Sequence, residues 1–507
     1  MRTLTLTIAW FIGTAGVLAA GPDPQRVHRE HTKAASPTFE HLVHTIEFRW
    51  LTRAEAEEDL DELEWLLENR FSYLRRKGVD YKEALDAIRS SLPERISRGA
   101  LALKLMKLIA LFGDGHSGIS DPRIREMCPG HLPFLMGESA GRLVAFKADR
   151  SGFLDEEHPF LATMDNKELD VWLKVAALTA TRGSGQFFRQ QCVQNLRDIQ
   201  YLRKELGLKG SNVVRVGLAS ADGKSARTLE LPLAGTPARA PPWPRKATRI
   251  LPGNIGYLRI PTMSDHPVYL ERLVAIMGQF KGTEALIIDV RGNGGGSRAP
   301  LRVLFPFFMS EDDPPQVLNI AAYRLGHSKD ILDARWLYPA DWKGWSAAER
   351  DAIKAVAERF QPQWPLPAGE FSDWHYLVIS PPDGKGGYYH YDRPVIILMD
   401  TVNYSASDIF LAAFKGRRDV TLMGSPSGGG SGRMQSYQLH HSDIRLTLSS
   451  MASFQPNGSL YDGNGIQPDV PIEPIPTDFI GRTDSVLAAA IARLKKEIPA
   501  TSPSPRP

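Results

Sequence analysis

Apolar residues recur every three or four positions between residues 56 and 74, a spacing that places them on one face of an α-helix. Thr52 and Glu55 form a capping-box pattern just before this stretch, which predicts where the helix begins. Two further segments with helical periodicity follow. We therefore expect residues 51–118 to form an N-terminal helical domain.

The pattern changes after this domain, where short apolar runs alternate with helical segments. Residues 221–224 have the sequence Ala-Asp-Gly-Lys, which is typical of a turn in a β-hairpin. Residues 186–206 are expected to form a helix. Residues 234–244 are rich in Pro and Ala and indicate a boundary. We expect residues 119–245 to be a separate middle region of mixed α and β structure.

Residues 246–475 alternate strand-like and helix-like stretches in the order of a βαβ unit. A long insertion rich in Trp and Tyr, residues 310–392, interrupts this order. Such a segment forms either a lid beside a site or, as aromatic residues more often do, part of a core. Residues 476–507 are expected to be a C-terminal helix followed by a disordered tail.

Residues 1–20 combine a basic start, an apolar stretch and small residues, which is the pattern of a secretory signal peptide. An uncleaved membrane anchor would need about 20 apolar residues, and this stretch is shorter. We expect an exported, periplasmic or extracellular protein with no stable membrane anchor after signal removal. Residues 21–50 are polar and rich in Pro and His, and are expected to be a linker.

The composition is that of an ordinary globular protein, with 42% hydrophobic and 23% charged residues. The net charge is only +3 and the basic residues form no dense run, so no nucleic-acid partner is expected. Cys128 and Cys192 could pair in an oxidising compartment or remain two free buried thiols. No cluster of Cys and His has the spacing of a zinc site, and no metal or cofactor is expected.

Ser405 is the strongest candidate for chemistry. It lies between residues 394–399, which predict a buried strand, and a helical segment that begins near Ile409. A serine on such a turn has its hydroxyl among the unpaired N–H groups of a helix N-terminus, which suits a nucleophile. The alternative is structural, because Ser405 and Asp408 also match a capping box.

A glycine-rich turn, residues 292–296, follows the predicted strand at residues 285–290. It weakly matches a dinucleotide-binding fingerprint, but Ser297 stands where the third glycine should be. Glycines also allow backbone N–H groups to approach a ligand oxygen closely, and such a turn suits an oxyanion hole equally well.

Four motifs occur along the chain in a fixed order: DVRGNGGG at residues 289–296, NYSASD at 403–408, GSPSGG at 424–429 and GNGIQPD at 463–469. Together they resemble the C-terminal-processing (tail-specific) serine peptidase family. The sequence DGHS at residues 114–117, after a helical segment, also resembles the start of that family. The resemblance implies an α/β fold with a ClpP/crotonase-like β-α-β core, an N-terminal helical domain and a PDZ-like middle region.

The resemblance also implies functional residues and a peptide or protein substrate. Ser405 would be the nucleophile, and the N–H groups of Ala406 and Gly295 would form the oxyanion hole. The processing peptidases use a lysine as base, but Gly430 stands at that position and residues 424–432 contain no lysine. Arg433 cannot replace it, because a guanidinium stays protonated.

The chain therefore resembles more closely the tricorn-like branch of the family, which uses a histidine as base. His116 matches that histidine, unless it is only a structural residue of its turn. Asp462 stands where the branch has a glutamate. The same family includes a retinoid-binding protein, so the alternative is a non-catalytic binding protein for a hydrophobic ligand or peptide. The sequence makes no prediction of oligomeric state.

Overall fold

The computed structural model describes residues 50–239, 241–244, 246–383 and 386–498. The expected signal peptide, nearly all of the linker and the end of the tail lie outside the described residues. Among the helices of the described ranges, none is both long and apolar enough to cross a membrane.

Three helices form the N-terminal layer: α2 (Arg53–Arg70), α3 (Tyr81–Ser90) and α4 (Arg98–Leu111). The predicted capping box is confirmed, since the Glu55 N–H donates to Thr52 Oγ1 and the Thr52 N–H donates to the Glu55 carboxylate at 2.7 Å. The apolar faces of the three helices meet in one core.

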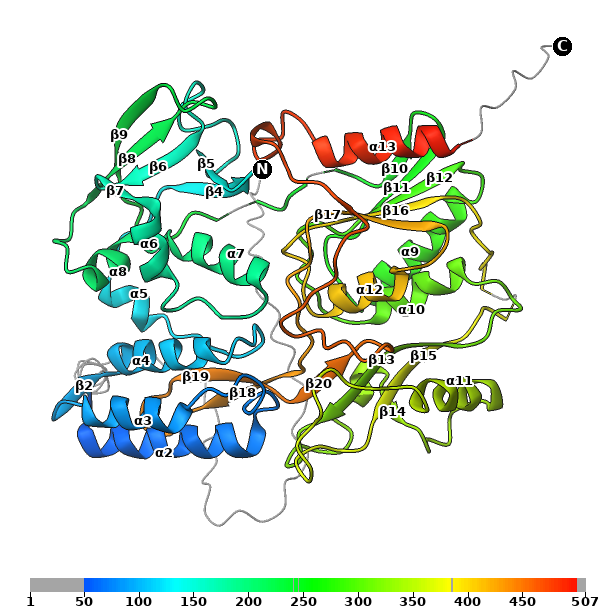
Figure 1. The fold of residues 1–507 in the computed structure, drawn as a ribbon, viewed down its shortest axis with the longest axis horizontal. Helices are drawn as coiled ribbons and strands as arrows, with labels where there is room; N and C mark the ends of the chain where they lie inside the picture. The colour runs from blue at the N-terminus through cyan, green and yellow to red at the C-terminus, as the bar shows by residue number, and fades with distance from the viewer. Residues whose placement is uncertain (1–49, 240, 245, 384–385, 499–507) are drawn as a thin grey trace, which may run out of the picture. The chain divides into compact units, whose positions relative to one another are not determined.

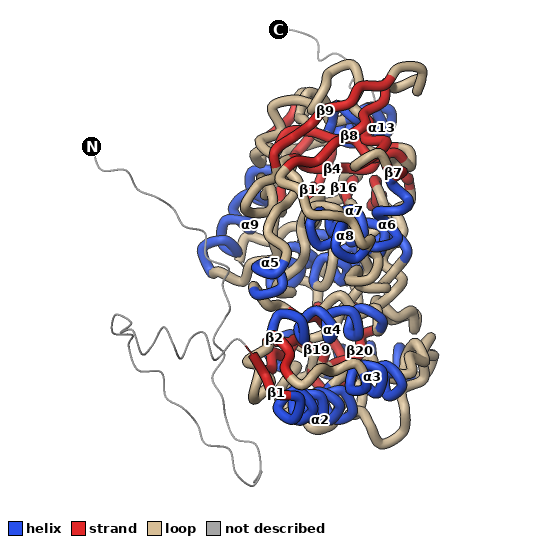
Figure 2. Tube along the Cα trace, turned by 90° about the vertical axis from the view of Figure 1, so that its left-hand side faces the viewer, coloured by secondary structure: helices blue, strands red, loops and turns tan. Residues whose placement is uncertain are grey.

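Strands from much later in the chain complete this layer (Figure 2). Strand β19 (Arg445–Ser449) lies between β18 (Met434–Gln438) and β3 (Gly118–Ile119), and all three are antiparallel. Leu446 of β19 lies opposite Ile119 and belongs to the same core as the helices. Strands β1 (Trp50–Thr52) and β2 (Arg95–Ser97) flank α2 and α3 in the chain and pair as a short two-stranded antiparallel sheet.

The middle region is a sheet packed against helices, and its elements are β4 (Phe134–Ser139), β5 (Arg142–Lys147), β6 (Phe160–Met164), β7 (Lys167–Glu168), β8 (Val213–Ala219), β9 (Ala226–Pro232), α5 (Arg123–Met127), α6 (Leu169–Ala176), α7 (Gly185–Asn195) and α8 (Ile199–Glu205). The hairpin predicted at residues 221–224 is confirmed by the pairing of β8 with β9. The single helix predicted over residues 186–206 is wrong, because residues 196–198 separate two helices. Cys128 and Cys192 are both buried and free.

The α/β core is a sheet in the order β10-β11-β12-β16-β17-β21, and its strands are β10 (Arg249–Leu251), β11 (Ile255–Arg259), β12 (Ala285–Asp289), β16 (Val395–Met399), β17 (Val420–Gly424) and β21 (Val470–Pro471). Helices α9 (Pro267–Phe280), α10 (Ala299–Leu304) and α12 (Ala406–Phe414) cover one face, and α13 (Ser485–Glu497) covers the other (Figure 1). The predicted βαβ unit is confirmed. Because β12 and β16 are parallel neighbours, the turns that follow them meet at one edge.

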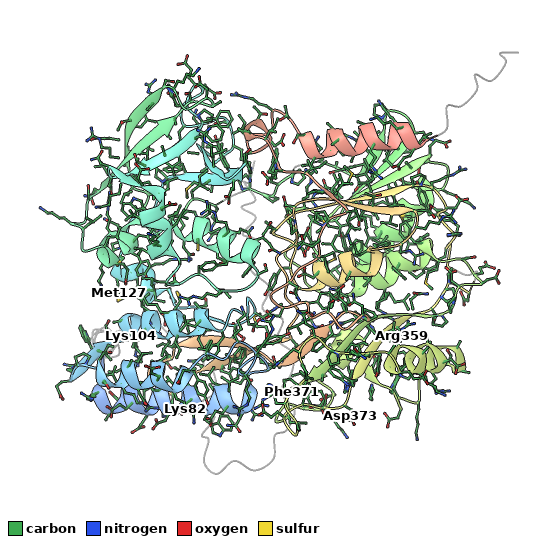
Figure 3. The ribbon with its side chains drawn as sticks, viewed as in Figure 1. Lys82, Lys104, Met127, Arg359, Phe371 and Asp373 are labelled. Atoms are coloured by element: carbon green, nitrogen blue, oxygen red, sulfur yellow. The ribbon has the colours of Figure 1, made fainter. Side chains whose placement is uncertain are left out.

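The insertion is folded into the body of the protein and follows η1 (Phe305–Phe308). The elements of the insertion are β13 (Gln316–Tyr323), η2 (Asp333–Arg335), β14 (Tyr338–Pro339), α11 (Ala347–Ala357) and β15 (His375–Ile379). Its strand β13 pairs with β20 (Met451–Phe454), which lies outside the insertion. Trp364, Phe371 and Trp374 pack against the core of the N-terminal layer, and Figure 3 shows Phe371 where the insertion meets that layer. These aromatic residues are therefore core residues. A 3-10 turn, η3 (Pro476–Asp478), precedes α13.

Candidate active site

Ser405 has a strained backbone. Its φ of 59° and ψ of −119° are rare for any residue other than glycine, and such outliers cluster at functional sites. It occupies the N-cap position of α12, but its side chain makes no capping hydrogen bond. The Asp408 carboxylate instead accepts from the N–H of Gly430 at 3.1 Å and from the Ser427 hydroxyl. The capping-box alternative for Ser405 is therefore wrong.

Backbone contacts fix the Ser405 turn between two loops. The Ser405 N–H donates to the Gly430 carbonyl at 2.9 Å, which joins the turn to the loop after β17. The Asn403 side chain is fully buried and donates to the Val290 carbonyl at 2.6 Å, which joins the turn to the end of β12. The motifs at residues 289–296, 403–408 and 424–429 thus meet around one serine.

The glycine-rich turn lies directly against Ser405. A Cβ added to Gly295 would stand 2.8 Å from Ser405 Cβ and 3.0 Å from Ala406 N, so no larger residue fits there. The Gly295 N–H donates to Asn293 Oδ1 at 2.9 Å, whereas the N–H groups of Ala406 and Gly296 have no hydrogen-bond acceptor among the described residues. Three backbone N–H groups therefore come from the two turns that meet at the serine.

His116 lies beside Tyr404, the residue before the serine, with ring centroids 4.9 Å apart. The Gly115 N–H donates to the Tyr404 hydroxyl at 3.0 Å, which fixes the two turns together. Within the described part of the chain, no hydrogen bond joins His116 to Ser405. His116 Nδ1 is buried and faces Asp114 Oδ1 at 3.7 Å, a distance too long for a hydrogen bond.

Asp114 is the acidic neighbour of His116 that sequence reasoning did not assign. It is fully buried, and burial alone would favour its neutral form, but contacts with His116 and Ser117 outweigh burial and lower its pKa. The Ser117 hydroxyl donates to Asp114 Oδ2 at 2.5 Å and accepts from the Ser449 N–H of β19 at 3.0 Å. The Asp-x-His spacing in the sequence was the available signal for this residue.

Asp462 is also fully buried, but its contacts differ from those expected of a residue that orients His116. Its Oδ2 lies 3.0 Å from Arg76 Nη1, and its carbonyl accepts from Arg76 Nη2 at 2.7 Å. Burial, followed by the charge of Asp114, raises the pKa of Asp462 to about 8. Asp462 belongs to the same group of buried charges as Asp114, but it does not contact the histidine ring nitrogens.

Tyr404 fills the space beside Gly430, the position at which the resemblance expects a lysine. A Cβ added to Gly430 would lie 2.0 Å from the Tyr404 hydroxyl oxygen. Any side chain at position 430 would therefore displace the phenol. The loop has glycine and not lysine at position 430, and the packing of Tyr404 leaves no room for a lysine side chain there.

A small cavity opens at the serine, and three arginine side chains contribute to its lining. Its enclosed volume is about 10 Å³, roughly the space of one water-sized group. Its lining consists of Arg298, Arg335, Ser405, Ala406, Ser431, Gly432, Arg433 and Met451. We call it the arginine cavity.

Residues 254–472 match the model of peptidase family S41. This part of the chain is therefore similar to peptidase family S41. The matched segment contains the glycine-rich turn, Ser405 and Asp462, and it begins after His116 and the middle region. The resemblance to the C-terminal-processing serine peptidases is thereby confirmed.

A curated protein and solved structures are also similar to this chain. A carboxy-terminal-processing protease of Bartonella bacilliformis is 31% identical over 100 residues, which are 20% of this chain and 23% of that protein. Solved structures of mature CPAF, free and complexed with lactacystin, superpose with a TM-score of 0.64 at 18% identity. They cover 88% of this chain and 98–99% of theirs, so this chain shares their mixed α/β fold.

Proposed function

We propose that this protein is a serine peptidase that cleaves peptide bonds through an acyl-enzyme on Ser405. The observation that carries the proposal is the strained, uncapped Ser405 at the meeting point of the family motifs, with free N–H groups beside it. Strain at a buried turn is retained where the fold needs that geometry for function. The match of residues 254–472 to peptidase family S41 supports the same reaction.

In the proposed mechanism His116 removes the proton from Ser405 as the hydroxyl attacks the peptide carbonyl. The free structure has no His116–Ser405 hydrogen bond, and catalytic hydrogen bonds often form only when substrate is bound. Asp114 is the orienting acid that the contacts favour, because it faces the other ring nitrogen. Asp462 contacts Arg76 and not His116.

The oxyanion that forms is stabilised by N–H groups of the two turns. Ala406 supplies one, because its N–H has no other acceptor among the described residues. Gly295 supplies the second by sharing its N–H with Asn293 Oδ1, or the adjacent Gly296 N–H takes that role. His116 passes the serine proton to the leaving amine as the C–N bond breaks and the acyl-enzyme forms. Water then attacks the acyl-enzyme, and its proton reaches Ser405 through His116 as the acid product leaves.

The direct test is labelling with a fluorophosphonate probe, which reacts with activated serine hydroxyls. Wild-type protein should be labelled at Ser405, and Ser405→Ala should not. The binding-protein alternative is less well supported, because the cavity at Ser405 has a volume of about 10 Å³, whereas pockets for small-molecule ligands span roughly 300–1,000 Å³. Folded wild-type protein that takes up no probe would contradict the peptidase proposal.

Export also remains a proposal, since the expected signal peptide lies outside the described residues. The basic, apolar and small-residue pattern of residues 1–20 supports it. N-terminal sequencing of the mature protein should find a start near residue 21. A mature protein that begins at Met1 would contradict export by this route.

A further inference from the structure

Three arginines converge on the nucleophile from separate parts of the chain. Arg298 follows the glycine-rich turn, Arg335 ends η2 in the insertion, and Arg433 precedes β18. All three line the arginine cavity together with Ser405 and Ala406. None of the mechanistic steps above uses a positive charge at this place.

The arrangement of the arginines is built by specific contacts. Buried Arg298 donates to the Arg335 carbonyl at 3.0 Å and to Asn319 Oδ1 at 2.7 Å. Arg335 Nη1 donates to the Gly296 carbonyl at 2.7 Å, which joins the insertion to the glycine-rich turn. These contacts hold two guanidinium groups beside the serine and satisfy only part of their hydrogen-bonding capacity.

The positive charges have no acidic partner. No Asp or Glu of the described ranges lies within ion-pair distance of any of the three arginines. At longer range, the charge of Asp265 acts on Arg335 and the charge of Asp330 acts on Arg433. Burial and then the neighbouring Arg335 lower the pKa of Arg298 to about 9. Arg433 Nε is buried without a hydrogen-bond partner. Such unpaired buried charge is costly and is retained mainly at functional sites.

We propose that the arginine cavity binds a carboxylate of the substrate residue next to the scissile bond. This rests on the proposed peptidase function and specifies its substrate. The planar guanidinium donors match a carboxylate, with which arginine forms paired hydrogen bonds. The small enclosed volume leaves no room for a large apolar side chain. The carboxylate comes either from an acidic side chain or from a peptide C-terminus.

The first experiment compares peptides that differ only in charge. One pair is acetyl-Ala-Ala-X-Ala-Ala-amide with X as Glu or Gln, and the other is acetylated penta-alanine with a free or an amidated C-terminus. Binding is measured on Ser405→Ala and kcat/KM on the wild type. We expect about tenfold or greater preference for a carboxylate-bearing peptide in one pair. Preference within the first pair indicates an acidic side chain, and preference only within the second indicates the C-terminus. Equal binding and cleavage within both pairs would overturn the proposal.

The second experiment assigns the preference to the cavity. Arg433→Gln should abolish most of the preference, and Arg433→Lys should keep part of it, because the charge remains. Arg350→Gln, on the exposed surface of α11, is the matched control and should leave the preference intact. A full preference in folded Arg433→Gln would contradict the cavity assignment. If Arg433→Gln does not fold, Arg335→Gln serves the same test.

The outcomes separate the two proposals. Cleavage without carboxylate preference would leave the peptidase function and overturn the carboxylate site. Carboxylate-selective binding by Ser405→Ala, without probe labelling or cleavage by the wild type, would leave the binding site and overturn the peptidase function. The melting temperature of Arg433→Gln should equal or exceed that of the wild type, because one of three mutually repelling charges is removed.

Discussion

The hydroxyl oxygen of Tyr404 lies only 2.0 Å from where a Cβ atom at Gly430 would stand. The same hydroxyl accepts from the Gly115 N–H, and the ring lies against His116. One phenol therefore excludes a lysine base from the loop and supports the turn that carries a histidine. Gly430 and Tyr404 are expected to tolerate substitution only together.

We predict that Gly430→Ala lowers both the melting temperature and the activity, because the new Cβ must push Tyr404 away from the residue next to the nucleophile. Tyr404→Ala/Gly430→Ala should lose less stability than the sum of the two single changes, since the clash is absent. Denaturant unfolding of the four proteins measures this coupling. Gly185→Ala, where an added Cβ meets no atom within 4 Å, is the matched control. Strict additivity would refute the packing argument.

Ser405→Ala should abolish hydrolysis and leave stability nearly unchanged. Loss of a catalytic serine costs around 10⁶ in kcat in a well-studied case, whereas no capping hydrogen bond is lost here. Peptide cleavage and thermal melting measure the two effects. Ser407→Ala is the neighbouring control, because the Ser407 hydroxyl is buried without a partner and should be dispensable. A Ser405→Ala protein with near wild-type turnover would end the assignment.

His116→Ala should lose most activity, because the imidazole is the group that accepts the serine proton in the proposed mechanism. Asp114→Asn should lose more activity than Asp462→Asn, since Asp114 faces the ring nitrogen and Asp462 faces Arg76. The pH–rate profiles of the four proteins test this order. An unchanged acidic limb in an active His116→Ala protein would show that the histidine is structural.

Asp408 should make the protein less stable as the pH rises from about 4 to about 7. Burial raises its pKa to about 7, so the folded state keeps a proton that the unfolded state has released. Its stabilising effect is complete below the unfolded pKa of about 3.9 and is lost as the pH rises through the folded pKa, by at most about 4 kcal/mol. Asp408→Asn should flatten this slope, although the raised pKa of Asp462 keeps part of it.

The measurement for Asp408 is urea unfolding at several pH values between 4 and 8. Asp419→Asn changes an exposed carboxylate and should keep the wild-type slope. A slope in Asp408→Asn that equals the wild-type slope would mean that Asp408 is charged in the folded protein at neutral pH.

Short-range sequence patterns predicted the local structure well. They could not predict contacts between segments that are distant in the sequence. The capping box at Thr52, the hairpin at residues 221–224 and the strand before Ser405 each depend on a few neighbouring residues. The contact of Tyr404 with Gly430 depends on how two loops pack, which no short-range pattern encodes.

The arginine cavity was missed for the same reason. Arg298, Arg335 and Arg433 look like ordinary surface residues in the sequence, and only the insertion and the loop after β17 bring them together. The predicted helix over residues 186–206 failed differently, because its apolar spacing continues through the short break that tertiary packing imposes.

The pairing of β3 with β19 has a consequence for biosynthesis. The turn that carries His116 obtains its strand partner only from residues 445–449, and Ser117 is bonded to Ser449, 332 positions later. A ribosome must therefore finish nearly the whole chain before this turn can be held beside Ser405. A nascent chain that already contains Ser405 should therefore not yet cleave other proteins. A chain truncated at residue 440 should take up no fluorophosphonate probe.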